Sequence, residues 1–316
     1  YTVAIPFAVD GTSTLASRTC PAVGSLTATG LNNRADLTVA GSTTTDPGCG
    51  NAPPPASTTP TKTVTSGPTL IGPNQYTISY QLDVTNSGGV PGTYTLDETP
   101  HFGAGVTINS ATCASSVPVG TGTADITPCT AVPAAITLVN NTPFNIATAG
   151  TVINNGATHR YAIVVTFTIV PSSVTLPTNG AGCDITPPPP TSNTGLNNTA
   201  TLTTTSGTTN SNVCRPLPPA LIINKTDPVV NGTVATYTMT VTNLGGAGTY
   251  TLNDSPLFGT GITITAAPTC TNTSVAPGVG DTTPTCTTTT GPWALADPNT
   301  AIAAAETARS PADGYT

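Results

Sequence analysis

The residues of this chain that could do chemistry are few, and most are cysteines. Eight cysteines fall into four local pairs, Cys20 and Cys49, Cys113 and Cys129, Cys183 and Cys214, Cys270 and Cys286. None forms a Cys-x-x-Cys motif, and with only two histidines the chain lacks the ligands of a zinc site. The spacing therefore predicts four local disulfides, and with them an oxidising, extracytoplasmic location. The alternative is that the cysteines are reduced and buried.

The chain has two lysines, Lys62 and Lys225, and they stand at equivalent positions near the start of a repeated stretch. Two carboxylates, Glu98 and Asp254, are equivalent in the same way. An amine and a carboxylate that recur together could form an ion pair, or even an isopeptide crosslink across a sandwich. The alternative, a solvated lysine at the entrance of each domain, is the commoner situation for this residue and is the one that we expect.

Other polar residues give weaker signals for chemistry. His101 follows an Asp-Glu pair, which could suggest acid/base catalysis, but the equivalent residue in the second repeat is Leu257, so we expect a surface loop residue. Asp125 and Asp281 lie in loops between paired cysteines, where calcium is conceivable; each loop offers one carboxylate, and calcium takes six or more oxygens. No nucleophile motif, phosphate loop or metal-ligand cluster is present. The sequence therefore predicts no enzyme activity, no cofactor and no metal.

These positions match because one stretch occurs twice, at residues 76–113 and 235–270. Tyr80, Leu82 and Val84 recur at a constant offset of 157 as Tyr237, Met239 and Val241. Their alternation with polar residues predicts a strand with one face on a core. Asn-x-Gly-Gly follows in both copies, and glycines that tolerate positive φ predict a turn to a next strand at residues 93–96 and 249–252.

The second copy carries a family resemblance. It reads Lys-Thr-Asp-Pro from Lys225, Asn-Gly at Asn231, Tyr-Thr-Met-Thr-Val-Thr-Asn from Tyr237, and Leu-Asn-Asp-Ser-Pro from Leu252. In these motifs the chain resembles the "domain of unknown function eleven" repeats of prokaryotic surface proteins, over about the first half of each repeat. The resemblance implies an immunoglobulin-like β-sandwich used in tandem in large secreted or wall-associated proteins. It implies no activity.

The composition predicts an all-β protein that binds neither nucleic acid nor an anionic membrane surface and has no membrane span. Threonine is the commonest of the 316 residues, 31 are glycine and 32 are proline, and the one helix candidate, residues 301–309, would be one or two turns or a loop. A net charge of −7 with seven basic residues leaves no cationic surface for nucleic acid or an anionic membrane. The longest apolar run, residues 161–170, is far too short for a membrane span and predicts a buried strand.

The cysteine spacing also predicts how the domains are arranged. Residues 62–214 hold a full set of motifs; residues 1–52 repeat its later part, with strands at Thr2–Val9 and Ala35–Ala40, and residues 220–316 repeat its earlier part. Stiff proline-rich linkers are expected at residues 53–61 and 215–219. The expected fold is therefore a series of tandem immunoglobulin-like β-sandwich domains joined by short Pro-rich linkers. Each half domain is completed by the complementary half of another copy, either in a covalent tandem array or in a head-to-tail, strand-exchanged polymer of the protein with itself.

These features predict a non-catalytic structural segment of an extracellular filament or cell-surface fibre. The alternative is a surface adhesin whose sandwiches bind a glycan or a host protein, and a third possibility is a spacer of a secreted glycan-active enzyme. Trp293 is the only tryptophan, so a sugar-binding face would lack the aromatic side chains it needs. Covalent glycans are possible at six sequons, which begin at Asn140, Asn197, Asn224, Asn231, Asn253 and Asn272.

Overall fold

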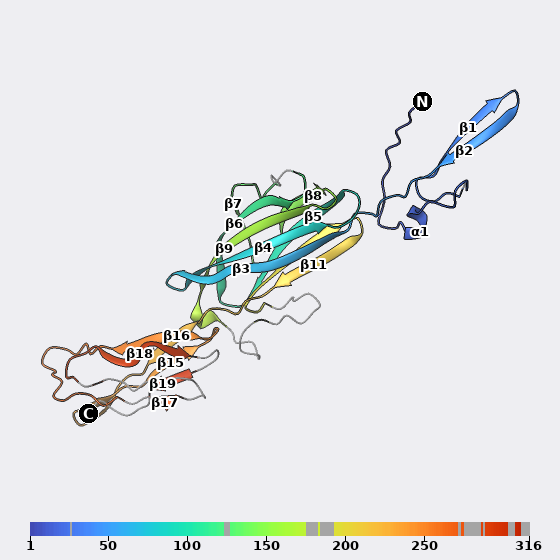
Figure 1. Cartoon of the computed structure of the whole chain (residues 1–316). Coiled ribbons are helices and arrows are strands. Elements are labelled where there is room, and N and C mark those ends of the chain that lie inside the picture. Colours follow the sequence, from blue (N-terminus) through green and yellow to red (C-terminus); the bar gives the residue numbers. More distant parts are fainter. Residues whose placement is uncertain are drawn as a thin grey trace.

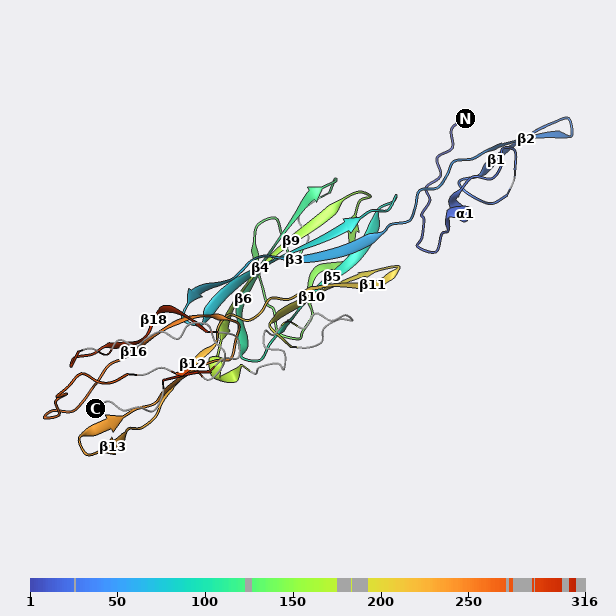
Figure 2. The same cartoon turned by 60° about the horizontal axis from the view of Figure 1, so that its bottom comes forward.

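The computed structural model of the chain describes residues 1–25, 27–122, 127–174, 183, 193–270, 273–274, 286, 288–302 and 307–310. This part of the chain is all-β, as predicted, and its helical structure is limited to the four-residue α1 (Leu15–Arg18) and the 3-10 turn η1 (Pro171–Ser173). None of its helices is long and apolar enough to cross a membrane. Figures 1 and 2 show an elongated arrangement, with residues 33–48 at one end, two facing sheets in the middle and the strands after residue 220 at the other end.

The middle of the chain forms two antiparallel sheets that share one core, and we call it the intact unit (Thr58–Val213). The first sheet has the strand order β3-β4-β9-β6-β7. These strands are β3 (Thr58–Gly72), β4 (Gln75–Asn86), β9 (Thr158–Ile169), β6 (Val106–Val119) and β7 (Ala134–Ile136). The second sheet has the order β11-β10-β5-β8. These strands are β11 (Gly207–Val213), β10 (Leu196–Thr204), β5 (Gly92–Phe102) and β8 (Phe144–Ile153).

The alternation of apolar residues correctly predicted which side chains form this core. Tyr80, Leu82 and Val84 of β4 are buried, and every second residue of β9 from Tyr161 is buried as well. The rings of Phe102 on β5 and Phe167 on β9 lie 5.9 Å apart, so the contact joins the two sheets. The run at 161–170 is thus a strand, but it is buried on one face, and Val164 on the other face is partly exposed.

The Asn-x-Gly-Gly turn forms where it was expected, but the reason given for its glycines is wrong. Neither Gly88 nor Gly89 has a positive φ. A Cβ on Gly88 would instead clash with the backbone of residues 55–57, which pass against the turn. Asn86, fully buried, holds that crossing together: its Oδ1 accepts hydrogen bonds from the backbone of Ser57 and Gly88, both at 3.0 Å, and its Nδ2 donates to Val90 O at 2.9 Å.

The N-terminal segment repeats the later part of the intact unit without a covering sheet. Its hairpin of β1 (Asn33–Val39) and β2 (Ser42–Gly48) pairs in the same register as β10 and β11, with Asn33 opposite Gly48 as Asn198 is opposite Val213. The first strand therefore begins two residues before the predicted Ala35–Ala40. The strand predicted at Thr2–Val9 is not formed, because this extended segment pairs with no strand in the part of the chain that the structure describes.

The C-terminal segment repeats the earlier part of the intact unit. Its strands are β12 (Leu221–Lys225), β13 (Val229–Asn231), β14 (Val234–Thr236), β15 (Met239–Asn243), β16 (Gly248–Asp254), β17 (Thr273–Ser274), β18 (Trp293–Ile302) and β19 (Thr307–Ser310). The pairing of β16 with β18 follows that of β5 with β8, including the position of the register shifts. The helix or loop expected at 301–309 is wrong for the described part of this range, because residues 301–302 belong to β18 and residues 307–309 to β19, which pairs with β15. Residues 303–306 lie outside the described residues.

The proline-rich segments are less separate from the sandwiches than predicted. The first linker was expected to reach residue 61, but β3 already begins at Thr58. In the second, Leu217 and Ala220 are buried against the core cluster of the intact unit, and Leu217 O accepts a hydrogen bond from Gly246 N. The second linker is therefore packed at the junction with the C-terminal segment. The prolines at 187–190 lie outside the described residues.

Candidate functional site

A buried amine, carboxylate and carboxamide meet between the two sheets of the intact unit. Lys62 comes from β3, and its Nζ lies 2.5 Å from Glu98 Oε2 of β5. Both side chains are fully buried. Asn198 of β10 donates a hydrogen bond from Nδ2 to the other carboxylate oxygen, Oε1, at 2.6 Å. The prediction of a solvated lysine is thus wrong for Lys62. The structure contains the alternative, an ion pair between Lys62 and Glu98.

Strand pairing explains why these three residues converge. On β5 and β10, Ala200 is opposite Glu98 and Asn198 is opposite Pro100, so Glu98 and Asn198 are diagonal neighbours on the same face of the second sheet. That face points at the first sheet, whose edge strand β3 carries Lys62. The backbone N–H of Lys62 also donates to Ser211 Oγ on β11 at 2.9 Å, which fixes the edge of one sheet against the edge of the other.

Burial changes the proton affinities around the triad of Lys62, Glu98 and Asn198. Loss of water lowers the pKa of the Lys62 ammonium, and the charge and hydrogen bond of Glu98 only partly oppose this effect. The ring of Tyr80 lies beneath the amine, with its centroid 5.2 Å from Nζ. Burial, together with the charge of Glu98, raises the pKa of the Tyr80 hydroxyl well above its ordinary value, so Tyr80 stays protonated.

The sequence analysis did not identify Asn198. The carboxamide oxygen of this side chain is in an unusual environment. Asn198 Oδ1 is buried and, among the described residues, has no hydrogen-bond partner. An orphaned carboxamide oxygen beside a buried ion pair is unusual in a folded core and requires an explanation. The signal that could have found Asn198 was the repeated Gly-Leu-Asn-Asn, at 30–33 and 195–198, which places Asn33 in the same hairpin position.

The C-terminal segment holds an incomplete version of the same site. Lys225 Nζ of β12 lies 2.5 Å from Asp254 Oδ1 of β16, and its distance to the centroid of the Tyr237 ring is 4.6 Å. The Lys225 side chain is 37% exposed, because among the described residues no strand equivalent to β10 covers it. The residues around it form an open groove of roughly 620 Å³ that is also lined by Phe258, Ile262 and Trp293.

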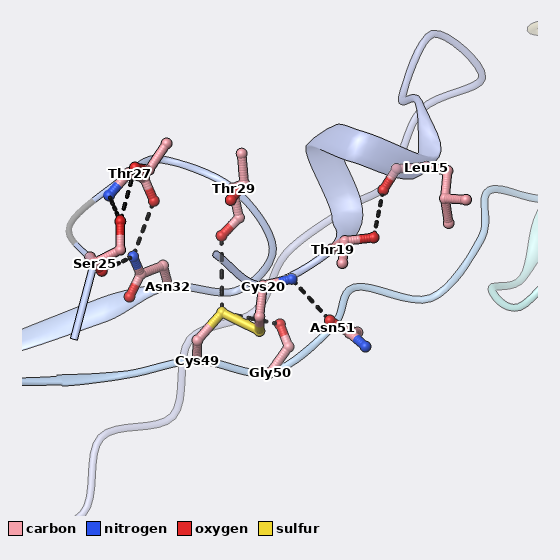
Figure 3. The surroundings of a disulfide bond; sticks show 10 residues. All are labelled: Leu15, Thr19, Cys20, Ser25, Thr27, Thr29, Asn32, Cys49, Gly50 and Asn51. Atoms are coloured by element: carbon pink, nitrogen blue, oxygen red, sulfur yellow. Dashed lines mark hydrogen bonds between the residues drawn. A yellow bond between two sulfur atoms is a disulfide. The ribbon is translucent and has the colours of Figure 1, made fainter. Parts of the chain in front are cut away.

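The four disulfides join the same local pairs that the spacing predicted: Cys20 to Cys49, Cys113 to Cys129, Cys183 to Cys214 and Cys270 to Cys286. Figure 3 shows the first, where Asn51 Oδ1 accepts a hydrogen bond from Cys20 N at 2.8 Å and Cys49 Sγ lies 3.8 Å from Thr29 O. In the intact unit, Cys214 Sγ lies 3.7 Å from Thr194 O, so this corner has the same construction. Four disulfides indicate an oxidising environment.

The remaining candidates show no site where they lie within the described residues. His101 lies at the end of β5, not in a loop, and its Nδ1 pairs with Asn141 Oδ1 at 2.8 Å. Asp125 and Asp281 lie outside the described residues, within which no cluster of metal-ligating side chains occurs. Among the sequons, Asn197 is fully buried, Asn224, Asn231 and Asn253 are exposed, and Asn272 is outside the described residues. Asn140 hydrogen-bonds the backbone of Phe102.

No protein-family model matches the chain, and no curated protein matches it.

Proposed function

We propose that the chain is a structural, non-catalytic segment of an extracellular filament or cell-surface fibre, built from tandem immunoglobulin-like β-sandwiches. Each terminal segment would be half of a sandwich, and the complementary half would come from another copy. The partner is thus the protein itself, in a covalent tandem array or a strand-exchanged polymer. The four disulfides fit an extracellular location, and the resemblance to repeats of surface proteins fits the same class.

The observation that carries this proposal is the exposure of apolar residues whose equivalents are buried in the intact unit. Phe7 is 52% exposed, whereas its equivalent Phe167 is 0% exposed. Leu37 on the lone hairpin is 66% exposed, whereas Leu202 is 1% exposed. Large apolar side chains left open on strands and sheet faces are typical of surfaces that another chain covers.

The C-terminal segment exposes the opposite half of the same contact. Phe258 is 43% exposed, whereas its equivalent Phe102 is 0% exposed and touches Phe167 across the core. The equivalent of that Phe102–Phe167 contact would be made between Phe258 and Phe7 of another copy. Strand addition would also supply backbone hydrogen bonds to the open edge of β14.

Native mass as a function of concentration tests the proposal. The full chain, measured by size-exclusion chromatography with light scattering, is expected to run as species larger than the 31.3 kDa of one copy. Phe7→Asp places a charge on the apolar face and is expected to abolish these species. Ala4→Asp is the matched control, because its equivalent Val164 lies on the outer face, and assembly is expected to persist. A stable particle of one copy at every concentration contradicts the proposal.

A further inference from the structure

We propose that Lys62 and Asn198 are joined by an amide bond between their side chains, formed autocatalytically with Glu98 as the proton shuttle. The site is a modification site within one sandwich, and its reaction requires no cofactor. All three side chains belong to the intact unit, so this bond does not depend on assembly.

The position of the carboxylate is the first support. An amine that attacks a carboxamide must lose protons, and the departing carboxamide nitrogen must gain one. Glu98 touches both of these atoms: Oε2 lies 2.5 Å from Lys62 Nζ, and Oε1 accepts from Asn198 Nδ2 at 2.6 Å. A general acid/base has to lie within hydrogen-bond reach of the protons that it moves, and here one carboxylate reaches both.

The reaction balances without an oxidant or a second substrate. The Lys62 ammonium transfers a proton to Glu98, and the neutral Nζ attacks Cγ of Asn198. The Nζ–Cγ bond forms, Glu98 gives its proton to Nδ2 and takes the second proton from Nζ, and the Cγ–Nδ2 bond breaks as Nδ2 leaves as ammonia. The products are a secondary amide, a protonated Glu98 and ammonia, and loss of ammonia to solvent makes the step irreversible.

Burial favours each stage. The fully buried site keeps water away from Cγ, and it favours the neutral amine over the ammonium, as the lowered pKa of Lys62 indicates. Two reactants held together in one core react as if at effective concentrations of about 10⁵–10⁸ M. The product also replaces a buried ion pair by neutral groups, and protonated Glu98 becomes able to donate to the Asn198 Oδ1 that now has no partner.

The incomplete site extends this chemistry to a bond between copies, and this extension rests on the proposed function. Lys225, Asp254 and Tyr237 reproduce Lys62, Glu98 and Tyr80. The missing carboxamide is Asn33, which holds in the β1–β2 hairpin the register position of Asn198 in β10–β11. When the hairpin of one copy completes the sheet of another, Asn33 is expected to enter the groove beside Lys225 and to form the equivalent amide.

Mass spectrometry of the full chain tests the bond within the intact unit. After reduction and alkylation, the protein is expected to be one ammonia lighter than its sequence predicts. Trypsin is expected to leave Lys62 uncut and to release residues 35–160 covalently joined to residues 161–225. Glu98→Gln retains the shape of the side chain but cannot shuttle the proton, and is expected to give the full sequence mass and separate peptides. Asp97→Asn, on the neighbouring position, is the control and is expected to keep the link.

A wild-type chain with native near-ultraviolet circular dichroism and the full sequence mass overturns the proposal. Because the wild-type mass decides it, a variant that fails to fold leaves the test intact. The bond between copies is read separately, as a ladder at multiples of 31.3 kDa under denaturing, reducing electrophoresis that Lys225→Arg and Asn33→Ala remove. If light scattering detects assemblies but electrophoresis shows no such ladder, only the bond between copies is refuted. If light scattering detects no assemblies, the proposed function is refuted, and the result for the Lys62–Asn198 bond is unaffected.

Discussion

Replacement of Leu82 by alanine measures how much the intact unit depends on the inner face of β4. Leu82 is fully buried, and its register places it between Lys62 on β3 and Tyr161 on β9. Removing a buried leucine side chain to alanine costs about 2–5 kcal/mol, and the upper part of that range applies where neighbours cannot collapse into the cavity. For a unit of this size, each kcal/mol lowers the melting temperature by about 2–4 °C.

Differential scanning calorimetry gives the change in melting temperature, and hydrogen exchange of the β4 and β9 amides assigns that change to the intact unit. The assignment is needed because a chain with several separately packed parts does not unfold as a single two-state system. Gln81→Ala is the matched control: it is adjacent, lies on the other face of β4 and is expected to change stability by less than about 0.5 kcal/mol. Equal effects of Leu82→Ala and Gln81→Ala would refute the inward orientation of Leu82.

Two further changes probe polar groups in the same unit. Burial lowers the pKa of His159, so just below the ordinary pKa of 6.5 the unfolded chain binds more protons than the folded chain. The free energy of unfolding is therefore expected to fall as pH drops through this value. Denaturant titrations of His159→Gln at several pH values should lack this part of the pH dependence. Asn86→Ala removes the side-chain partner of four backbone groups, the N–H of Ser57 and Gly88 and the carbonyls of Val90 and Ile153. It is expected to cost about 2–4 kcal/mol in the same titrations, whereas Ser87→Ala at the exposed neighbouring position is expected to cost little.

The sequence predicted the strands well because their signal is local. Alternating apolar residues identify β4 and β15 and the faces of these strands that enter a core, and this holds without knowledge of the partner strand. The prediction of a helix or loop for the alanine-rich segment 301–309 was wrong because pairing with distant strands, not the local sequence, decides its structure. Its composition favours helix, but at residues 301–302 and 307–309 pairing with β16 and β15 overrides a preference of a few tenths of a kcal/mol per residue.

The site could be predicted only in part because its members lie far apart in the chain. The repeat singled out Lys62 and Glu98, yet nothing local distinguishes a buried lysine from a solvated one. Asn198 is a common residue in a polar run, and its role follows from the register of β10 on β5. Gly88 likewise serves a close approach of residues 55–57, which is a tertiary contact and leaves no mark in the local sequence.

A bond between Lys62 and Asn198 would change how the intact unit bears a load. Tension applied to the two ends of the chain would enter the intact unit at β3 and leave it through β11, and the proposed bond connects β3 to β10, the neighbour of β11. The 136 residue steps between the two side chains (198 − 62) would then be bypassed. A fully extended chain spans about 3.3–3.6 Å per residue. Without the bond, and with the disulfides reduced, unfolding of this segment would therefore lengthen the chain by roughly 450–490 Å.

Single-molecule pulling on the reduced full chain by its two ends is expected to lack this extension in the wild type. Glu98→Gln, which cannot form the bond, is expected to release it in one unfolding event. Asp97→Asn should behave as the wild type does, because its side chain lies outside the triad. Equal extension of the wild type and Glu98→Gln would mean that the load is carried by strand pairing and packing alone, and that the triad is a buried ion pair with a hydrogen-bonded asparagine.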